Sequence, residues 1–502
     1  MSSLVHLHTK DNVALTLEML PEGTVAEGDI TATTTILARH KIATKPIPAG
    51  AIIYKYGHPI GQASSDIAVG DHVHTHNCEM LASRDETSDT SNIAPIKAAP
   101  TDEQATFQGY KRPGGKVGTR NFIGIITTVN CSATVAKQIT RKIERSGYLD
   151  NLTNVDGLVA ITHGTGCGMQ SSGEAFEILQ RTLSGYIDHP NFGGVLVIGL
   201  GCEVMQLEKL SSEDDQRIVK KLNIQKAGGT TKAIAEGISI VKGMAEEVNN
   251  LERSTQSASH LTIALQCGGS DAYSAISANP ALGIAADTLV KNGGSAILSE
   301  TPEIYGAEHL LLARAASEDV AQALKDRIKW WEDYAAMHGA TLNSNPSPGN
   351  LAGGITTILE KSLGAQAKGG STPLNAVLRY GEKRTVAGLN FMDSPGYDPV
   401  SVTGQVASGA NIVLFTTGRG SAFGFKPVPS IKLATNTALF EHMPEDMDIN
   451  CGGVLTKDET LEECGVRIFN EILAVASGET TSSEHLDYGD NEFTPWQLGG
   501  TF

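Results

Sequence analysis

The apolar residues before residue 80 lie in short runs that turn-forming residues separate. Runs typical of β-strands occupy residues 13–20, 30–38 and 51–57, and Gly, Pro and Asp fill the segments between them. Short strands bounded by such residues are typical of a small all-β module. The pattern therefore predicts an all-β domain over residues 1–80.

Residues 81–106 follow as a polar segment without apolar periodicity. The segment is rich in Ala and Pro. Such a composition is typical of a linker and not of a packed element. We therefore expect a linker over 81–106, and the clearest domain boundary of the chain.

From residue 107 the pattern changes to nearly continuous apolar runs that alternate with helical segments. Strand-like runs rich in β-branched residues occupy 121–129, 157–162, 193–201, 261–269 and 294–300. Amphipathic helical periodicity covers 132–147 and much of 307–339. Strands that are apolar throughout and alternate with helices indicate mainly parallel sheets covered on both faces. The predicted fold class is thus multi-domain, with a small all-β module followed by α/β domains.

Turn formers gather again between residues 340 and 385. Beyond them, a further apolar strand at 410–418 and a helical pattern at 460–476 indicate a second α/β unit. We therefore expect a central α/β domain over 107–345 and a C-terminal α/β lobe over 346–502.

Composition and charge narrow the classes of function. A chain of 502 residues is too long for one ordinary core. The net charge of −17 and the pI near 5.3 disfavour nucleic acid and anionic membranes as partners, but an anionic small molecule needs only a local cation. The sequence begins without a signal-like leader and has no apolar run of about 18 residues, so we expect a cytoplasmic location and no membrane partner.

Thiols, imidazoles and carboxylates follow the predicted strands of the α/β region. Seven cysteines, an odd number spread along the chain, favour reduced thiols or metal ligands over a disulfide framework. Because ligands of parallel sheets bind outside the carboxyl ends of the strands, we expect the groups in these turns to share one crevice. The predicted metal ligands in that crevice are Cys131, Cys167, Cys202, Cys267 and Glu300.

Other interpretations of these thiols stay open. A cysteine after a strand is often a small buried residue. The spacing does not match a zinc ribbon. A mononuclear iron site and an iron–sulfur cluster held by dispersed thiolates are both compatible with it. The sequence has no dinucleotide or phosphate-binding motif between a strand and a helix, so no nucleotide cofactor is expected.

Histidines concentrate in the first domain, which holds seven of the fourteen in the chain. His72, His74 and His76 alternate in the stretch GDHVHTHN, so they project onto one face of a strand. A solvated edge strand explains this spacing as well as a metal or acid–base site does. His8 and His40 lie near turns of the same domain and are further proton-transfer candidates.

Arg419 lies in a glycine-flanked turn after the apolar run 410–418. A guanidinium in such a turn can hold a carboxylate through two hydrogen bonds. Lys41, directly after His40, is a second candidate for the same role. The residues therefore indicate a site for a small anionic substrate.

Taken together, these segments resemble the altronate/galactarate dehydratase family along nearly the whole chain. The stretches GDHVHTHN and YGDNEFTPWQ are similar to the altronate branch of that family. The other carrying stretches are HTKDNVAL, HKIA, YKYGHPIG, GYKRPGGKVGTRN, HGTGCGM, GLGCE, QCGGSDAYSAISANPA, NPSPGNLAGG, TGQVASGAN, FTTGRGSAFG, KLATNT and DMDINCG.

The resemblance implies a fold, a reaction and a cofactor. It implies an N-terminal SAF-type β-clip module and a large dehydratase portion. The implied reaction is the dehydration of D-altronate to 2-dehydro-3-deoxy-D-gluconate in hexuronate breakdown, with Fe(II), or alternatively Mn(II), as the divalent metal. We further expect a homo-oligomer, a dimer. Galactarate dehydratase, sulfolactate sulfo-lyase and a sugar-acid binder without turnover are the rival interpretations.

Such a reaction needs a base for the C2 proton, a partner for the enolate-like dianion and an acid for the departing C3 hydroxyl. For proton transfer we predict the histidines His8, His40 and His163. For substrate binding we predict Lys41, Arg419, Asp271, His72 and His74. The alternating histidines lie in a segment that resembles the altronate branch, whereas both branches of the family share the same chemistry. We therefore expect these histidines at the edge of the site and not as the catalytic base.

Overall fold

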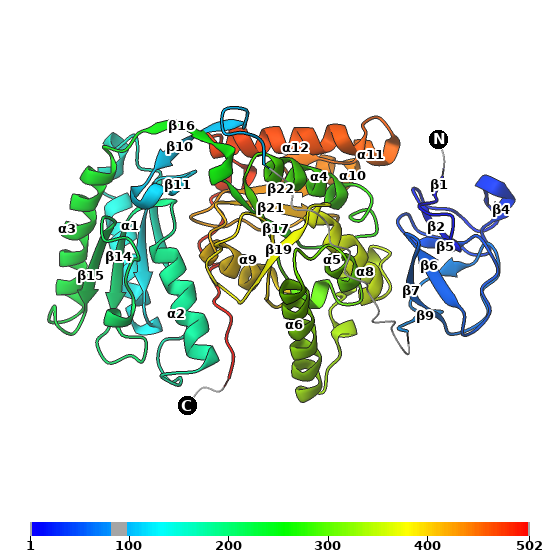
Figure 1. Cartoon of the computed structure of the whole chain (residues 1–502), viewed down its shortest axis with the longest axis horizontal. Helices are drawn as coiled ribbons and strands as arrows, with labels where there is room; N and C mark the ends of the chain where they lie inside the picture. The colour runs from blue at the N-terminus through cyan, green and yellow to red at the C-terminus, as the bar shows by residue number, and fades with distance from the viewer. Residues whose placement is uncertain (1–2, 82–97, 500–502) are drawn as a thin grey trace.

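The structure, a computed structural model, describes residues 3–81 and 98–499. Figure 1 shows three bodies, with the N-terminal domain at one end of the molecule. Most of the predicted linker 81–106 lies outside the described residues. Its last part packs on the third body, where the Ala99 amide donates to the Lys291 carbonyl at 2.8 Å. Across 3–81 and 98–499, no helix is both long and apolar enough to cross a bilayer.

Short antiparallel strands build the N-terminal domain, which confirms the predicted all-β module. Its first sheet has the order β1-β2-β5-β8, formed by Leu4–Val5, Val13–Thr16, Lys41–Ala43 and His72–Val73. Its second sheet has the order β6-β7-β9, formed by Ile52–Lys55, His58–Ala63 and Cys78–Glu79. A separate pair joins β3 (Val25–Ala26) to β4 (Ile30–Thr31). Ile42, Ile53 and Ile60 are completely buried between these sheets.

The second domain is a parallel sheet with helices on both faces. Its order is β13-β12-β14-β15, formed by Gly157–Ile161, Phe122–Thr127, Phe192–Gly199 and Ile218–Asn223. The helices α1 (Ala133–Glu144) and α3 (Thr230–Val248) pack on one face, and α2 (Glu174–Ile187) packs on the other. Burial on both faces is the reason why these strands are apolar throughout.

The third domain contains a seven-stranded parallel sheet. Its order is β19-β20-β18-β17-β21-β22-β23, formed by Leu374–Leu378, Gly388–Met392, Ser295–Leu298, Thr262–Cys267, Ile412–Thr417, Ser430–Ala434 and Ile449–Asn450. The helices α4 (Ala278–Lys291) and α12 (Leu461–Ala476) cover one face, and α9 (Asp398–Ala407) covers the other. The predicted division at residue 345 falls within this sheet, because the turn-rich segment near 345 is a surface loop of one domain. These parallel sheets confirm the predicted α/β class.

The strand order places a crevice at the carboxyl end of β17. The chain continues from β17 to β18 on one side and later returns to β21 on the other side. Where the strand order changes direction in this way, the loops at the carboxyl end of the strand lead to opposite sides. Ligands of open α/β sheets bind between these loops. Cys267 is the last residue of β17.

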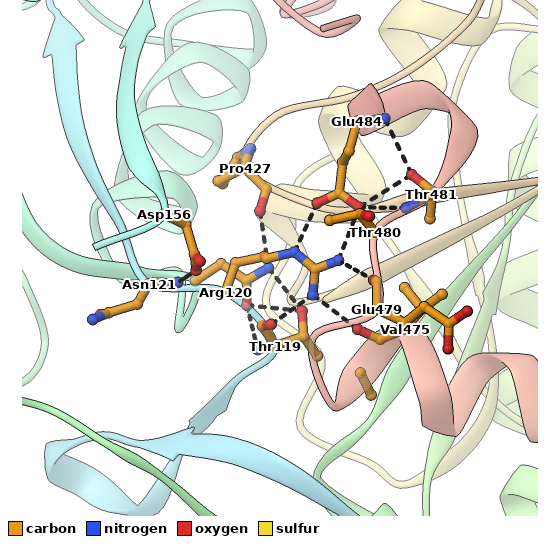
Figure 2. A network of polar contacts seen from close by, with 12 residues as sticks. Thr119, Arg120, Asn121, Asp156, Pro427, Val475, Glu479, Thr480, Thr481 and Glu484 are labelled. Atoms are coloured by element: carbon orange, nitrogen blue, oxygen red, sulfur yellow. Dashed lines mark hydrogen bonds and ion pairs between the residues drawn. The ribbon is translucent and has the colours of Figure 1, made fainter. Parts of the chain in front are cut away.

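A buried arginine joins the second and third domains, and we call its surroundings the Arg120 seam (Figure 2). The Arg120 guanidinium binds the Glu484 carboxylate at 2.7 and 2.8 Å. Its remaining donors reach the carbonyls of Thr119, Val475 and Glu479, each at 2.8 Å. The charge is therefore paired and its hydrogen bonds are made within the protein.

Candidate active site

The N-terminal domain packs on the third domain through three buried charges, Lys41, Lys55 and Glu360, which we call the N-terminal seam. Glu360 lies on α8 (Ile358–Ala365), beside the N-terminal domain in Figure 1, and its carboxylate is 2.8 Å from Lys41 Nζ and 2.7 Å from Lys55 Nζ. Lys41 also donates to the Gly354 carbonyl at 2.6 Å. Burial opposes the charge on Glu360, but the two ammonium groups hold the pKa of its carboxyl well below the usual value. Burial also lowers the pKa of Lys41, so the seam pairs one carboxylate with two lysine side chains.

Four histidines of the N-terminal domain lie together beside this seam. The His40 ring is 5.1 Å from that of His72 and 4.8 Å from that of His74, and His76 is 5.3 Å from His72. His40 Nδ1 and His72 Nε2 are 2.9 Å apart, and His74 Nε2 reaches the Leu351 carbonyl at 2.9 Å. Burial, followed by the neighbouring imidazoles, lowers the pKa of His40 to about 4 and that of His72 to about 3. His40 and His72 are therefore neutral near neutral pH, and each of these two rings can accept a proton.

One arginine of the N-terminal domain and one of the third domain are accessible to solvent. Arg39 Nη1 is 3.5 Å from Asp271 Oδ2, and the Arg39 side chain is still 31% exposed. Its backbone has a φ of 76°, a strained value for a residue other than glycine, which is typical of functional sites. Arg419 is exposed and lies beside Gly349 and Gly269 in the turn after β21. Both guanidinium groups are therefore accessible to an anionic ligand.

The residue after Glu360 belongs to a second buried charge cluster. Lys361 Nζ is 2.7 Å from Glu303 Oε1. Lys368 Nζ is 2.7 Å from Cys267 Sγ, which in turn is 3.6 Å from Glu303 Oε2. Burial raises the pKa of the Cys267 thiol to about 12. Consecutive residues of α8 therefore connect the N-terminal seam to the carboxyl end of β17.

Cys267, Glu300 and Glu303 form a metal-ligand triad at this strand end. One ligand atom from each lies within 4.8 Å of the other two, and all three residues are buried. Neither Glu300 oxygen accepts an ordinary hydrogen bond from the described residues, although the Gln266 side chain is in weaker contact. Burial and then Glu303 raise the pKa of Glu300 well above the usual value. A buried carboxylate without a partner, beside a thiol and a second carboxylate, fits a divalent cation.

A further carboxylate, Asp398, lies at the start of α9 beside the triad. Gln266 Nε2 donates to Asp398 Oδ1 at 3.0 Å, and Ser401 Oγ donates to Gln266 Oε1 at 3.0 Å. Burial, and then the charge of Glu303, raise the pKa of Asp398 to about 6. The strand end therefore gathers one thiol, three carboxyl groups and two lysines.

A small cavity lies between the two clusters. Tyr56 of the N-terminal domain lines it together with Asp271, Asn279, Glu360 and Lys361 of the third domain. Tyr56 is another non-glycine residue with positive φ, 59°. The N-terminal domain and the third domain thus border one small cavity, which Lys361, the ion-pair partner of Glu303, also lines.

The structure divides the five predicted metal ligands between two sheets. Cys267 and Glu300 lie in the triad of the third domain. Cys131, Cys167 and Cys202 are exposed at the carboxyl ends of β12, β13 and β14 in the second domain. The prediction of one crevice did not anticipate that the strands belong to separate sheets.

His163 also lies in the second domain, at the end of β13. Its Nε2 is 3.0 Å from the Thr127 carbonyl and its Nδ1 is 3.0 Å from Thr165 Oγ1. Burial lowers its pKa to about 4. These contacts hold the loop after β13 against β12, and a catalytic role for His163 stays a prediction.

The remaining predicted residues lie at or near the N-terminal seam. The donors of Lys41 go to Glu360 and Gly354, which assigns it to domain docking, and its role as a substrate clamp stays a prediction. His8 is exposed in a turn and packs against Gly57. Sequence reasoning missed the residues Arg39, Lys55, Glu360 and Asp398. Lys55 and Glu360 are 305 positions apart, so no local pattern could have joined them.

Three family models match the chain in the order of its three domains. Residues 2–81 match the altronate/galactarate dehydratase SAF domain. Residues 109–249 match the second domain of D-galactarate dehydratase/altronate hydrolase, and residues 258–501 match the C-terminal domain of D-galactarate/altronate dehydratase. The three domains define the class of protein, a dehydratase with an N-terminal SAF domain.

Individual relatives align over almost the complete chain. An altronate dehydratase of Bacillus subtilis (strain 168) is 36% identical over 97% of this chain and 98% of its own length. An altronate dehydratase of Escherichia coli (strain K12) is 36% identical over 96% and 97%. A galactarate dehydratase (L-threo-forming) of the same strain is 38% identical over 95% and 93%. The chain belongs to the altronate/galactarate dehydratase family, whose members are hydro-lyases, and the predicted family is confirmed.

Proposed function

We propose that this protein dehydrates D-altronate to 2-dehydro-3-deoxy-D-gluconate at the N-terminal seam. The observation that carries the proposal is the meeting of neutral histidines, accessible arginines and the buried triad around one seam. The full-length similarity to two altronate dehydratases from different bacteria supports the substrate.

The substrate carboxylate is assigned to the two accessible arginines. Arg39 and Arg419 are accessible, and a guanidinium binds a carboxylate through two hydrogen bonds. Asp271 positions Arg39 in this arrangement.

The C2 proton is assigned to His40. Its low pKa makes it neutral at working pH, and the neighbouring His72 nitrogen at 2.9 Å can share an acquired proton. A positioned imidazole is the usual general base near neutral pH. His72 and His74 therefore support His40 from the edge of the site, and His8 is a more distant proton-transfer candidate.

The triad is assigned to the metal. Cys267, Glu300 and Glu303 would hold a divalent ion, Fe(II) in our proposal, because a thiol combined with carboxylates suits a first-row transition metal. When bound, the ion supplies charge stabilisation for an enolate-like dianion. Asp398, whose pKa burial raises to about 6, is assigned as the acid for the departing hydroxyl.

Galactarate is the second candidate substrate, because the galactarate dehydratase relative is 38% identical to the chain. Galactarate carries a second carboxylate in place of a terminal hydroxyl, and would need both arginines as separate partners. Altronate needs only one carboxylate partner. The two substrates therefore make different demands on Arg39 and Arg419.

An anaerobic assay of the purified protein tests the proposal. Altronate, galactarate and sulfolactate are each offered with Fe(II), Mn(II) or a chelator, and 2-keto acid formation is measured. We expect kcat/KM for altronate with Fe(II) to exceed that for galactarate at least about tenfold, a difference of 1.4 kcal/mol in transition-state binding. A higher value with galactarate would assign that substrate instead, and binding without any product would contradict an enzymatic role.

A further inference from the structure

Three exposed cysteines of the second domain take no part in the site above. Cys131, Cys167 and Cys202 follow three neighbouring parallel strands, β12, β13 and β14. The carboxyl ends of parallel strands meet at one edge of the sheet. The three thiols therefore lie at the same edge, each in its own loop.

Hydrogen bonds tie the three loops to one another next to the thiols. The Asn130 amide, adjacent to Cys131, donates to the Thr165 carbonyl at 3.0 Å. The Gly166 carbonyl, adjacent to Cys167, accepts from the Val204 amide at 2.9 Å. Glu203, adjacent to Cys202, closes the ring by accepting from Thr128 Oγ1 at 2.7 Å. Each pair of loops is thus bonded directly.

Glycines allow this close approach. Gly166 has a φ of 96°, and a Cβ there would lie 2.1 Å from the Thr128 carbonyl oxygen. Gly201 has a φ of 130°, and a Cβ there would lie 2.5 Å from the Gln225 side chain. Only glycine fits both positions, since other residues would be strained and would collide. The backbone therefore holds Cys167 and Cys202 in fixed loops.

The three thiols are open to a ligand. Cys131 lies two residues before α1, whose first turn has no side-chain cap. The amides of that helix N-terminus can face a negatively charged group bound there. All three thiols are exposed, and Cys202 accepts only a long contact from Gln225 Nε2, at 3.6 Å. They are accessible in a way that buried Cys267 is not.

The spacing of the thiols favours a cluster over a single ion. A tetrahedral ion with bonds of about 2.3 Å to sulfur needs its thiolates roughly 4 Å apart. Within the described ranges, the group of potential ligands that lie within 4.8 Å of one another is the triad of the third domain, and these thiols form no such group. An iron–sulfur cluster places its metal ions between the thiolates and so accepts wider spacing.

We propose that Cys131, Cys167 and Cys202 bind an iron–sulfur cluster through their thiolates, separate from the metal triad at Cys267. The three loops supply one thiolate each, so a cubic cluster would keep one iron without a thiolate from them. The inference does not depend on the proposed substrate.

Reconstitution of the purified full-length protein with sulfide and a mixture of Fe(II) and Fe(III) under anaerobic conditions tests this site. We expect about four iron and four sulfide per chain for a cubic cluster, and about one further iron for the triad, with visible charge-transfer absorbance. In the triple variant C131S/C167S/C202S, both the sulfide and the absorbance should be lost. Because the three side chains are exposed, the melting temperature of the apoprotein should stay close to that of the wild type.

The variant E300Q is the matched control, because it changes the triad and leaves the three thiols in place. It should keep the sulfide and the absorbance, whereas the proposed function predicts that it loses turnover. Sulfide and absorbance retained in the triple variant would overturn the cluster. One metal ion per chain without sulfide, lost in the triple variant, would overturn it in favour of a single ion.

Discussion

Two buried charge clusters, the Arg120 seam and the N-terminal seam, hold the domains together, and they differ in how fully their polar groups are paired. At the Arg120 seam, the guanidinium donors go to the Glu484 carboxylate and to backbone carbonyls (Figure 2). At the N-terminal seam, Glu360 satisfies two lysines, but the adjacent histidines contact one another and Arg39 remains partly exposed. A seam whose hydrogen-bond donors and acceptors are all paired within the protein stabilises the fold. Groups that keep unpaired donors or acceptors can bind a ligand.

Buried histidines show the same contrast. His189, near the Arg120 seam, contacts the Ala410 carbonyl at 2.9 Å through Nε2 and accepts from the Asn191 amide at 3.1 Å through Nδ1. His40 faces another imidazole at 2.9 Å. Both rings are neutral near pH 7, but a proton on His40 can be shared with a side chain. Neutrality alone therefore does not identify a catalytic histidine. The hydrogen-bond partner of each ring nitrogen distinguishes a structural histidine from a catalytic one.

The largest effect is expected at the N-terminal seam from Glu360→Gln. This change leaves Lys41 and Lys55 buried without a counter-charge, and breaking a buried ion pair costs about 3–5 kcal/mol. Denaturant unfolding should show that loss in free energy, and turnover should fall with it because the N-terminal domain carries His40. A stable variant with full turnover would show that the seam does not hold the site together.

Arg120→Leu should separate stability from activity at the other seam. The free energy of unfolding should fall by about 3 kcal/mol, the lower end for a buried pair, because Glu484 is 22% exposed. The kcat of the folded protein should stay within about twofold of the wild type, since no predicted substrate group lies there. Loss of kcat without loss of stability would reverse the comparison.

Acid should act on the Arg120 seam through His189. Burial lowers its pKa to about 3 from 6.5, so between these values the unfolded chain binds a proton that the folded chain does not. His189 therefore makes stability fall as pH drops from 6.5 towards 3, by up to about 1.4 kcal/mol per pH unit. The free energy of unfolding of His189→Gln is measured between pH 4 and 6, about two units inside that window. Its dependence on pH should be weaker than that of the wild type by up to about 1.4 kcal/mol per pH unit. An unchanged slope would show that His189 is already protonated in the folded protein.

The smallest effect is expected from Arg39→Lys at the border of the histidine cluster. Lysine keeps the charge but loses the paired hydrogen bonds of a guanidinium, so KM should rise about tenfold with little change in kcat. Arg467→Lys, in an exposed pair with Glu459 on α12, is the matched control and should leave both constants unchanged. Steady-state kinetics distinguish the two, and equal KM values would remove Arg39 from the substrate site.

The sequence pattern was sufficient for the domain types, because each depends on local signals. The continuous apolar run of β14 reflects burial on both sheet faces, and the short runs of the first 80 residues reflect small antiparallel strands. The same pattern could not tell that β14 and β17 belong to different sheets. Strand order depends on contacts between distant segments, so the thiols that follow these strands were placed in one crevice.

The candidate site could be predicted only where chemistry and local pattern coincide. His40, His72 and His74 were identified from their enrichment in the first domain, and Cys267 and Glu300 from strand ends. Glu360 lies within a helical segment and has no motif of its own. Its role follows from Lys41 and Lys55, more than 300 positions away, which only the folded chain brings to it.

The most direct test of the account compares two histidine variants, His40→Gln and His189→Gln. The measurement is kcat for 2-keto acid formation with the better of altronate and galactarate, at pH 7.5 (roughly one unit above the ordinary histidine pKa). Loss of a general base typically lowers kcat about 100- to 10,000-fold, and we predict a loss of that size for His40→Gln, with His189→Gln within about twofold of the wild type. A His40→Gln variant with the kcat of the wild type would contradict a catalytic centre at the N-terminal seam.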